Sequence, residues 1–224
     1  MLAALLGRKI GMTRVFDKDG ASVPVTVVEA GPCTVLQVRT QDHDAYHAIQ
    51  LGFADTKPGR CTLPAIGHAA KAGATPKAFV REVRLSEPAE VKAGEVLNVE
   101  RFEGVTRVDV IGTTRGFGFQ GVMKRYHFGG QPGSHGTERK HRSPGSIGGM
   151  AGDRGRGRSV KRGKKMPGHM GHNQRTGRNQ RVMAIDKDKN ILLIEGAVPG
   201  PRNGFVLVRE SKKAIAKAAK KSKG

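Results

Sequence analysis

Residues that could bind a ligand or do chemistry concentrate between Arg115 and Arg181. The run "GFGFQG" (116–121) matches the G-x-G-x-x-G pattern with which dinucleotide-binding enzymes approach a pyrophosphate. The surrounding chain lacks a βαβ repeat, and no acidic residue follows about 20 positions later, so the pattern is incomplete. The runs "GRGRS" and "RGKKM" lack the G-K-S/T of a phosphate-binding loop. A nucleotide-binding enzyme is therefore the class of function that the sequence supports least.

Histidines are the second group with possible chemistry. Five of them lie in this segment, and imidazole is a common metal ligand, but no Cys is nearby and the surrounding Lys and Arg repel a cation. The two carboxylates, Glu138 and Asp153, are 15 positions apart, which does not suggest a catalytic pair. We expect no catalytic residue, no metal site and no cofactor. The histidines are expected to hydrogen-bond to nucleic acid or stack on it.

Positive charge is the dominant property of the segment. The 224-residue chain contains 40 Lys and Arg against 19 Asp and Glu, a net charge of +21. Residues 115–181 hold 16 basic and 2 acidic side chains, whereas residues 1–114 hold 14 and 13. This imbalance points first to nucleic acid as the partner and second to an anionic membrane surface. No apolar run approaches the ~18 residues of a spanning helix, and "MLAALL" is too short for a signal-peptide core, so no membrane association is expected.

The basic segment combines Gly, which allows close backbone approach, with cations that can contact phosphates. The aromatic residues Phe117, Phe119, Tyr126 and Phe128 could stack on bases or pack the root of the segment against the rest of the protein. The residues expected to bind RNA are Arg8, Lys9, Arg115, Lys124, Arg125, His127, Arg139, Lys140, His141, Arg142, Arg154, Arg156, Arg158, Lys161, Arg162, Lys164, Lys165, His169, His172, Arg175 and Arg178.

Strands on both sides of this segment must position it. The runs "VPVTVVEA" (23–30), "CTVLQVRT" (33–40) and "AYHAIQLGF" (45–53) are rich in β-branched residues, and their short breaks predict antiparallel neighbours in a meander or barrel. Further strands are expected at "KAFVREVRL", "EVLNVERF", "VTRVDVIGTT" and "GFVLVRES", and a hairpin at "RVMAIDKDKNILLIEGAVPG". A short helix is expected to end near Gly73, and another in "GFGFQGVMKRYHF".

The strands predict a mainly β fold, a split antiparallel β-barrel with a small α+β insertion. Residues 1–114 and 179–210 would form the barrel, 55–95 a small inserted lobe, 115–178 a long basic loop and 211–224 a Lys-rich tail. Closing the sheet removes exposed edges but needs strands from both sides of the loop. The loop is either a flexible basic linker in every context or an extension that orders inside folded RNA. Its length of more than 60 residues favours the second.

Five motifs, which follow one another along the chain, resemble the bacterial form of the large-subunit ribosomal protein L3 family: "LLGRKIGMTRVF", "VDVIGTTRGFGFQGVMKRYHFGG", "SHGTERKHRSPGSIG", "GKKMPGHMGH" and "GAVPGP". The likeness spans roughly residues 4–208. It implies a barrel of the translation-protein type and a non-enzymatic, cytoplasmic role in the ribosome. Implied partners are large-subunit rRNA, bound early in assembly, and the neighbouring ribosomal proteins L-fourteen and L-nineteen.

The resemblance also implies that the tip of the long loop, residues 146–158, lies near the peptidyl transferase centre. The tip residues singled out are Ser146, Ile147, Gly148, Gly149, Met150 and Asp153. Some bacterial members have a methylated Gln directly after "SIG", where this chain has Gly149, so we expect no such modification. The alternative function is a general DNA-binding or chromatin-binding architectural protein with a basic arm.

Overall fold

The computed structural model describes residues 3–17, 19–148, 160 and 162–213. The chain divides into two compact units. The first is built from residues 1–114 and 174–224, and the second from residues 115–173.

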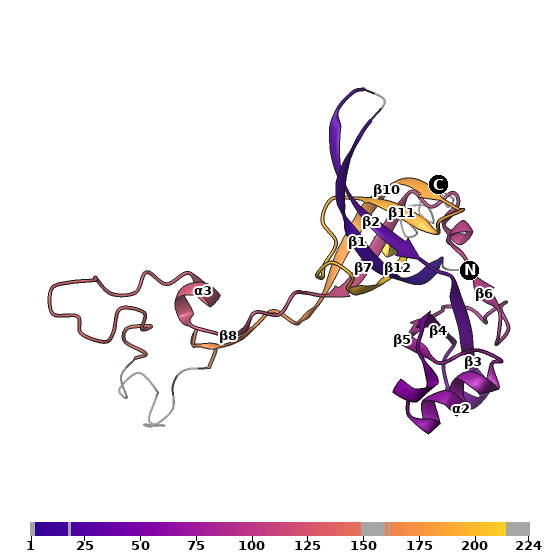
Figure 1. Ribbon diagram of the computed structural model, residues 1–224, viewed down its shortest axis with the longest axis horizontal. Coiled ribbons are helices and arrows are strands. Elements are labelled where there is room, and N and C mark those ends of the chain that lie inside the picture. Colours follow the sequence, from indigo (N-terminus) through magenta and orange to yellow (C-terminus); the bar gives the residue numbers. More distant parts are fainter. Residues whose placement is uncertain (1–2, 18, 149–159, 161, 214–224) are drawn as a thin grey trace, which may run out of the picture. The chain divides into compact units, whose positions relative to one another are not determined.

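Six antiparallel strands of the first unit close into a barrel (Figure 1). Their order around the barrel is β1, β12, β7, β10, β11 and β2, and β2 pairs again with β1. The expected mainly β fold with an antiparallel barrel is confirmed. The strand bounds are β1 Ala4–Phe16, β2 Ser22–Ala30, β7 Arg107–Thr113, β10 Gln174–Asp186, β11 Ile191–Glu195 and β12 Phe205–Glu210.

The core of the first unit follows the two-residue period of its strands. Successive side chains of a strand point to opposite faces, so every second residue enters the barrel. Each fully buried apolar side chain contributes about 1.5–3 kcal/mol relative to an exposed one. Fully buried pairs at this spacing are Val108 and Val110, Leu192 and Ile194, and Val206 and Val208.

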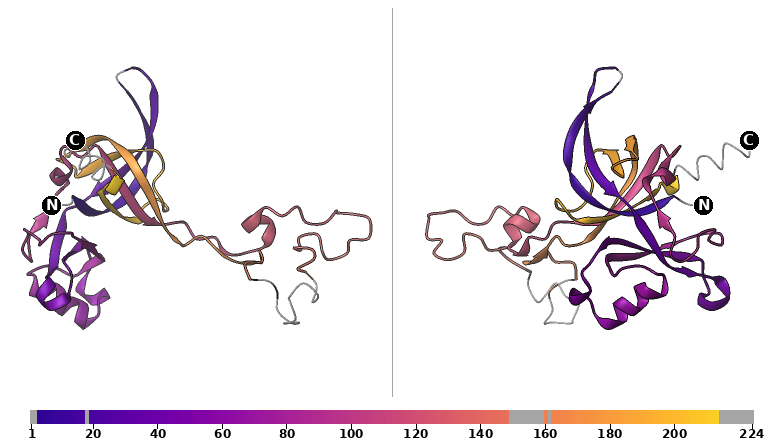
Figure 2. Two further views of the ribbon diagram at one scale, coloured as in Figure 1. Left: turned by 180° about the vertical axis from the view of Figure 1, so that it is seen from behind. Right: turned by 45° about the vertical axis from the view of Figure 1, so that its right-hand side comes forward.

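A second sheet, ordered β5, β4, β3 and β6, belongs to the same unit (Figures 1 and 2). The prediction that residues 33–40 and 45–53 continue the barrel beside 23–30 is wrong, because β2 already has β1 and β11 on its two sides. The chain instead leaves the barrel at Gly31 and Pro32. The bounds are β3 Cys33–Arg39, β4 Ala48–Asp55, β5 Lys77–Arg84 and β6 Val96–Leu97, with helices α1 Gln41–Asp44, η1 Pro58–Arg60, α2 Leu63–Lys71 and η2 Val99–Phe102.

Local predictions for this sheet are mostly correct. The helix expected to end near Gly73 is α2, and the strand expected at "KAFVREVRL" is β5. The strand expected over "EVLNVERF" is only two residues long. Its second half is the 3₁₀ helix η2, because Val99 and Phe102, three residues apart and both fully buried, suit a helix with three residues per turn.

Phe205 of β12 joins the barrel to the second sheet. Its ring stacks on Phe79 of β5, with centroids 4.9 Å apart and planes 7° from parallel. Phe53 of β4 meets it edge-on at 6.2 Å. The Arg8 guanidinium of β1 lies 5.4 Å from the centroid of the same ring. Three strands from two sheets therefore pack on one aromatic side chain.

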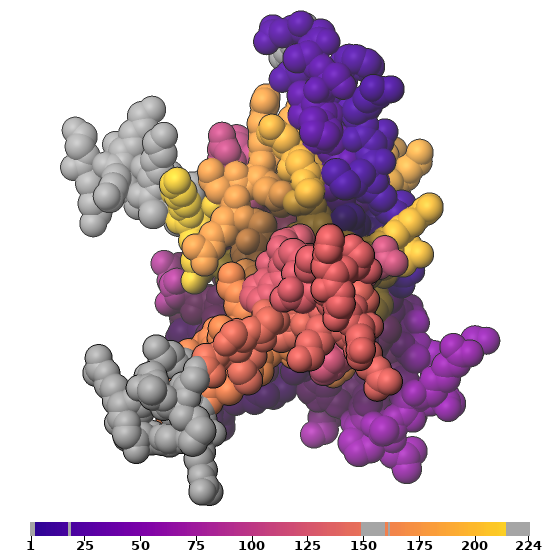
Figure 3. Space-filling model, turned by 90° about the vertical axis from the view of Figure 1, so that its left-hand side faces the viewer, coloured from indigo at the N-terminus to yellow at the C-terminus, as the bar shows by residue number. Residues whose placement is uncertain are grey.

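In the part of the chain that the structure describes, no other strand pairs with the far end of the β1–β2 hairpin. β12 pairs with β1 only as far as Arg8, and β11 pairs with β2 only from Val25 onward. The two strands continue to pair with each other as far as Phe16 and Ser22. This end of the hairpin extends beyond the barrel in Figures 1 and 3.

The strands that lead into and out of the second unit are direct neighbours. Thr113 of β7 pairs with Gln174 of β10, and a bulge in β10 follows between Gly177 and Gln180. The buried Asp109 holds this bulge, because its Oδ1 accepts a hydrogen bond of 2.9 Å from the Asn179 N–H. Arg175 and Arg178, which we expected in the basic loop, lie in β10 and are exposed.

Candidate nucleic-acid interface

The second unit begins and ends with a two-stranded ribbon. β8 (Gly118–Gln120) pairs antiparallel with β9 (Gly168–Met170), although the two are far apart in the sequence. The five-residue helix α3 (Val122–Tyr126) follows β8 and confirms the short helix expected there. Among the described residues of this unit, Val122 is the only buried one. This part of the chain therefore gains little stability from a hydrophobic core and depends on hydrogen bonds and ring contacts.

Close backbone approach explains part of the glycine content. Gly171 has a φ of 75°, and a Cβ there would lie 2.1 Å from the carbonyl oxygen of Arg115. The neighbouring Met170 carbonyl accepts a hydrogen bond of 2.9 Å from the Phe117 N–H. The outgoing and returning chains can thus pair only because position 171 carries no side chain.

Arg125 ties α3 to the returning chain. Its Nη1 donates a hydrogen bond of 2.8 Å to the Met166 carbonyl, and its guanidinium lies 5.0 Å from the Tyr126 ring centroid. A Cβ at Gly168 would come within 2.6 Å of Arg125 Nη1, so a side chain there would displace the guanidinium. One of the cations expected to bind RNA is therefore also part of the internal structure of the unit.

Aromatic rings hold several of the expected RNA-binding cations in place. Arg115 and Lys124 lie 5.8 and 5.2 Å from the centroid of Phe117, a ring that is 42% exposed. The Lys165 ammonium lies 5.7 Å from the centroid of Tyr126. Each such contact contributes about 0.5–1 kcal/mol at an exposed site. The rings therefore restrict where these positive charges can point.

A second aromatic contact leaves its ring open to solvent. Phe119 is 68% exposed and meets the His169 ring edge-on, with centroids 5.9 Å apart. The two side chains project from paired positions of β8 and β9. An exposed ring of this kind can stack on an unpaired base without moving other protein groups.

The described Lys and Arg side chains of the second unit are not neutralised by described carboxylates. Among its described residues, no Lys or Arg forms an ion pair. Arg125 and His141 are half-buried. The exposed members of the expected set are Arg115, Lys124, His127, Arg139, Lys140, Arg142, Arg162, Lys164, Lys165, His169 and His172, with Ser146, Ile147 and Gly148 at the start of the tip. Gly149, Met150, Asp153, Arg154, Arg156, Arg158 and Lys161 lie outside the described residues.

Arg8 and Lys9 belong to β1 in the first unit and contact protein groups. Lys9 Nζ donates hydrogen bonds of 2.8 Å to the Val198 carbonyl and 3.3 Å to the Gly200 carbonyl. Partial burial lowers the pKa of Lys9. Both cations therefore help to hold the barrel, and their contact with RNA remains a prediction.

The alternative ligand patterns find little support in the described residues. No group of three or more His, Cys, Asp and Glu comes together there as a metal site would require. The dinucleotide-like run falls on β8, whose sheet has only two strands, and on the turn before α3. No helix in the described ranges is long and apolar enough to cross a membrane.

Comparison with known proteins identifies the family. The family model described as "Ribosomal protein L3" matches residues 79–191. A protein of Acidothermus cellulolyticus named "Large ribosomal subunit protein uL3" is 51% identical over 212 residues, which cover 95% of this chain and 94% of the relative. The chain belongs to the ribosomal protein L3 family. Members with the same name from Streptomyces avermitilis (48% identical; 95% of this chain, 97% of the relative) and Corynebacterium diphtheriae (45%; 97% and 98%) are similar over nearly their full length.

Sequence reasoning missed the internal organisation of the second unit. The sequence predicts that all these cations are equally available for RNA, whereas the Arg125 guanidinium donates a hydrogen bond to the Met166 carbonyl within the unit. The pairing of β8 with β9, which joins the two ends of the unit, was not predicted either. The alternation of Gly and Phe over residues 116–119, which has the two-residue period of a strand, was the available signal for β8. No comparable signal marks the three residues of β9.

Proposed function

We propose that the exposed cations of residues 115–173 bind large-subunit rRNA. As a member of the ribosomal protein L3 family, the chain is a structural, non-enzymatic constituent of the large ribosomal subunit in the bacterial cytoplasm. The observation that carries the proposal is the unpaired charge of the second unit: its described cations have no carboxylate partner, so they are available to contact the phosphates of a polyanion.

The proposed mechanism divides the work between the two units. The closed barrel is a rigid anchor, because its core and its ladder of strand pairs are complete without RNA. The described residues of the second unit form almost no core, and its cations neutralise phosphates where RNA helices crowd together. Phe119 adds a stacking surface for an unpaired base. Binding would convert a flexible RNA junction into a fixed arrangement and so support early assembly of the subunit.

Two finer parts of the proposal come from the family resemblance. The tip, residues 146–158, would help to organise RNA near the peptidyl transferase centre, and any effect on peptide-bond formation would be indirect. Ribosomal proteins L-fourteen and L-nineteen would be neighbours in the subunit. Replacing Arg154, Arg156 and Arg158 with Gln should hinder assembly or disturb the catalytic centre while leaving the melting temperature of the barrel unchanged.

Salt dependence of binding tests the electrostatic mechanism. If about 10 phosphates are neutralised, log affinity for large-subunit rRNA should fall with log salt with a slope of about −9 on duplex and −7 on single strands. Fluorescence anisotropy of a labelled rRNA fragment between 50 and 300 mM salt, to give about a sixfold range, measures this slope. A slope near zero would refute the mechanism.

Matched variants locate the contacts. Changing the exposed Arg139, Lys140 and Arg142 to Gln should reduce the magnitude of the slope by about 3, since each phosphate contact contributes about 0.9. The control changes Lys57, Arg60 and Lys189, exposed cations of the first unit, to Gln and should leave the slope unchanged. Equal affinity for duplex DNA and for structured rRNA would favour the DNA-binding alternative instead.

A further inference from the structure

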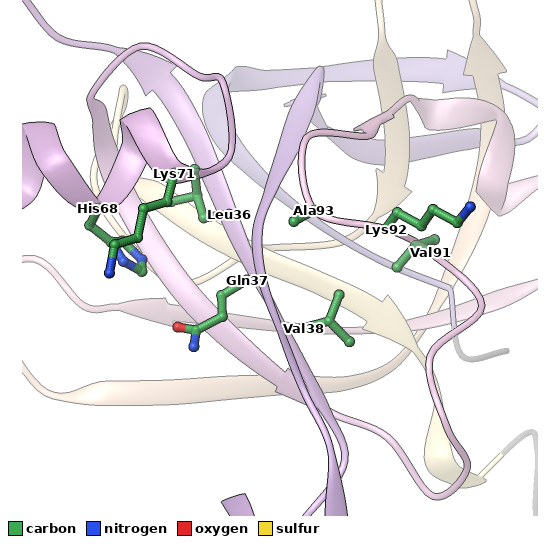
Figure 4. A pocket seen from close by; sticks show the side chains of 8 residues that line it. All are labelled: Leu36, Gln37, Val38, His68, Lys71, Val91, Lys92 and Ala93. Atoms are coloured by element: carbon green, nitrogen blue, oxygen red, sulfur yellow. The ribbon is translucent and has the colours of Figure 1, made fainter. Parts of the chain in front are cut away.

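A groove of about 500 Å³ runs beside β3 of the second sheet (Figure 4). Its lining includes Leu36, Gln37 and Val38 of β3, Lys71 of α2, and Val91 and Lys92 from the chain that precedes β6. All residues that line this groove belong to the first unit. The groove is therefore independent of the second unit and of the RNA binding proposed for that unit.

The groove follows a stretch of β3 that lacks a neighbouring strand on one side. β6 pairs only with Cys33 and Thr34, and the hydrogen bonds of Val35 with Gly94 and Glu95 end this contact. β4 stays paired on the other side as far as Arg39. Within the described ranges, no backbone hydrogen bond reaches residues 36–39 from the side of β6. Four residues of open edge correspond to about 13 Å of strand.

The side chains that line the groove confirm that it lies at an edge. The pairing of β3 with β4 shifts register between Val35 and Gln37, so the side chains of Leu36, Gln37 and Val38 do not alternate strictly between the two faces of the sheet. In Figure 4, Leu36 and Gln37 extend toward the side of α2 and Val38 toward the other side. Residues of both faces can line one groove only where the sheet stops.

The groove combines an apolar floor with positive charge on its rim. Leu36 and Val91 are buried and form part of the floor. Lys71 and Lys92 are exposed at its two sides, and neither forms an ion pair with a described residue. No acidic side chain lines the groove. The nearby Glu95 carboxylate accepts a hydrogen bond of 3.2 Å from the Lys92 backbone N–H.

Charge argues for protein over nucleic acid as the occupant. Residues 33–97, which contain the second sheet, hold 8 basic and 7 acidic side chains, in contrast to the strongly basic second unit. A near-neutral lobe offers little attraction for a polyphosphate backbone. An open strand edge with an apolar floor is the arrangement that accepts an added peptide strand, with main-chain hydrogen bonds for affinity and side-chain pockets for specificity.

We propose that this groove binds an extended acidic segment of a partner protein, which adds a strand along residues 36–39. Apolar side chains of the segment pack on Leu36, Val38 and Val91. Asp or Glu side chains on the two faces of the segment lie opposite Lys71 and Lys92, whose charges select an acidic segment over a basic one.

Photo-crosslinking in intact large subunits tests the proposal. The exposed Ala93 at the groove is replaced with p-benzoyl-phenylalanine, and the exposed Ala65 of α2, which does not line the groove, is the control position. We expect the Ala93 probe to crosslink to a protein segment that contains both acidic and apolar residues, and the Ala65 probe not to reach that segment. The crosslinked peptide is identified by mass spectrometry.

Charge variants then test the selection. Lys71→Glu with Lys92→Glu should reduce the crosslink yield at position 93 about tenfold, and Lys71→Gln with Lys92→Gln about threefold. Lys57→Glu with Arg60→Glu makes the same charge change elsewhere on the lobe and should leave the yield within about twofold. Thermal unfolding of each purified variant shows that it is folded. Crosslinks only to rRNA, to this same chain or to a basic segment would overturn the proposal, as would no crosslink or a yield unaffected by charge reversal.

Discussion

Replacing Gly7 with Ala tests how tightly the barrel is closed. Gly7 lies in β1 between Ala30 of β2 and Val206 of β12. A Cβ at this position would lie 2.3 Å from the Glu29 carbonyl oxygen and 3.1 Å from the Ala30 Cα. Both atoms belong to the backbone, so a rotamer change cannot relieve the clash and the two strands must separate. Such overpacking costs about 1–3 kcal/mol or more, and the lower entropy of unfolded Ala offsets about 0.4–1 kcal/mol of it.

We therefore expect Gly7→Ala to lower the free energy of unfolding by about 2 kcal/mol. With a urea slope of about 2 kcal/mol/M, the midpoint falls by about 1 M. The chain has no Trp, so far-UV circular dichroism of the full chain is the appropriate signal. Gly11→Ala is the matched control, because Gly11 is in the same strand and nothing lies within 4 Å of its Cβ position. Midpoints for the two variants that agree within about 0.25 M would refute the reasoning.

Three further predictions follow from other contacts. Phe205→Ala should lower the free energy of unfolding by about 2–3 kcal/mol, because the half-buried ring packs on Phe79 and Phe53. Amide hydrogen exchange of this variant should show the second sheet opening at a lower free energy than the barrel. A single, unchanged opening free energy for both sheets would contradict this. Burial raises the pKa of Cys33 to about 12, so at pH 8 a thiol reagent should label Cys61 in the native state and Cys33 only after unfolding, and equal labelling rates would count against it. Hydrogen bonds from Lys77 and Thr75 lower the pKa of Asp55 below its ordinary 3.8. Their stabilisation is present above pH 3.8 and is lost as the pH falls through the lower folded pKa. Asp55→Asn should therefore destabilise the protein by about 0.5 kcal/mol at pH 6 and by less as the pH is lowered below 3.8, and a pH-independent difference in urea unfolding would exclude this origin.

Much of the fold could be predicted because most strands carry their own signal. β7 alternates apolar and polar residues, β11 and β12 are short apolar runs, and all three lie outside the basic segment. The sheet to which each strand belongs could not be predicted in the same way. Short breaks suggested that β2 and β3 are neighbours, but both sides of β2 are taken by β1 and β11, and pairing of that kind depends on residues far away in the sequence.

The candidate site was predictable in its chemistry and much less in its geometry. Composition alone indicates that the cations of residues 115–181 bind a polyanion. It does not indicate that Arg125 binds the Met166 carbonyl or that Lys9 binds the Val198 carbonyl, because these partners are backbone groups that every residue carries. The groove beside β3 likewise depends on where β6 stops, and neither composition nor periodicity reports where a two-residue strand ends.

The strand order of the barrel has a consequence for synthesis of the chain. β1, β2 and β7 are made first, but each needs a later strand beside it: β12 for β1, β11 for β2, and both β10 and β12 for β7. The last of these ends at Glu210, almost 100 residues after Thr113. At about 5–20 residues per second, the open edges of β7 wait about 5–20 s for their partners, and those of β1 and β2 wait longer. During that interval the growing chain carries unpaired β edges and a neutral, apolar half-barrel, which makes it a natural client for chaperones at the ribosome that synthesises it.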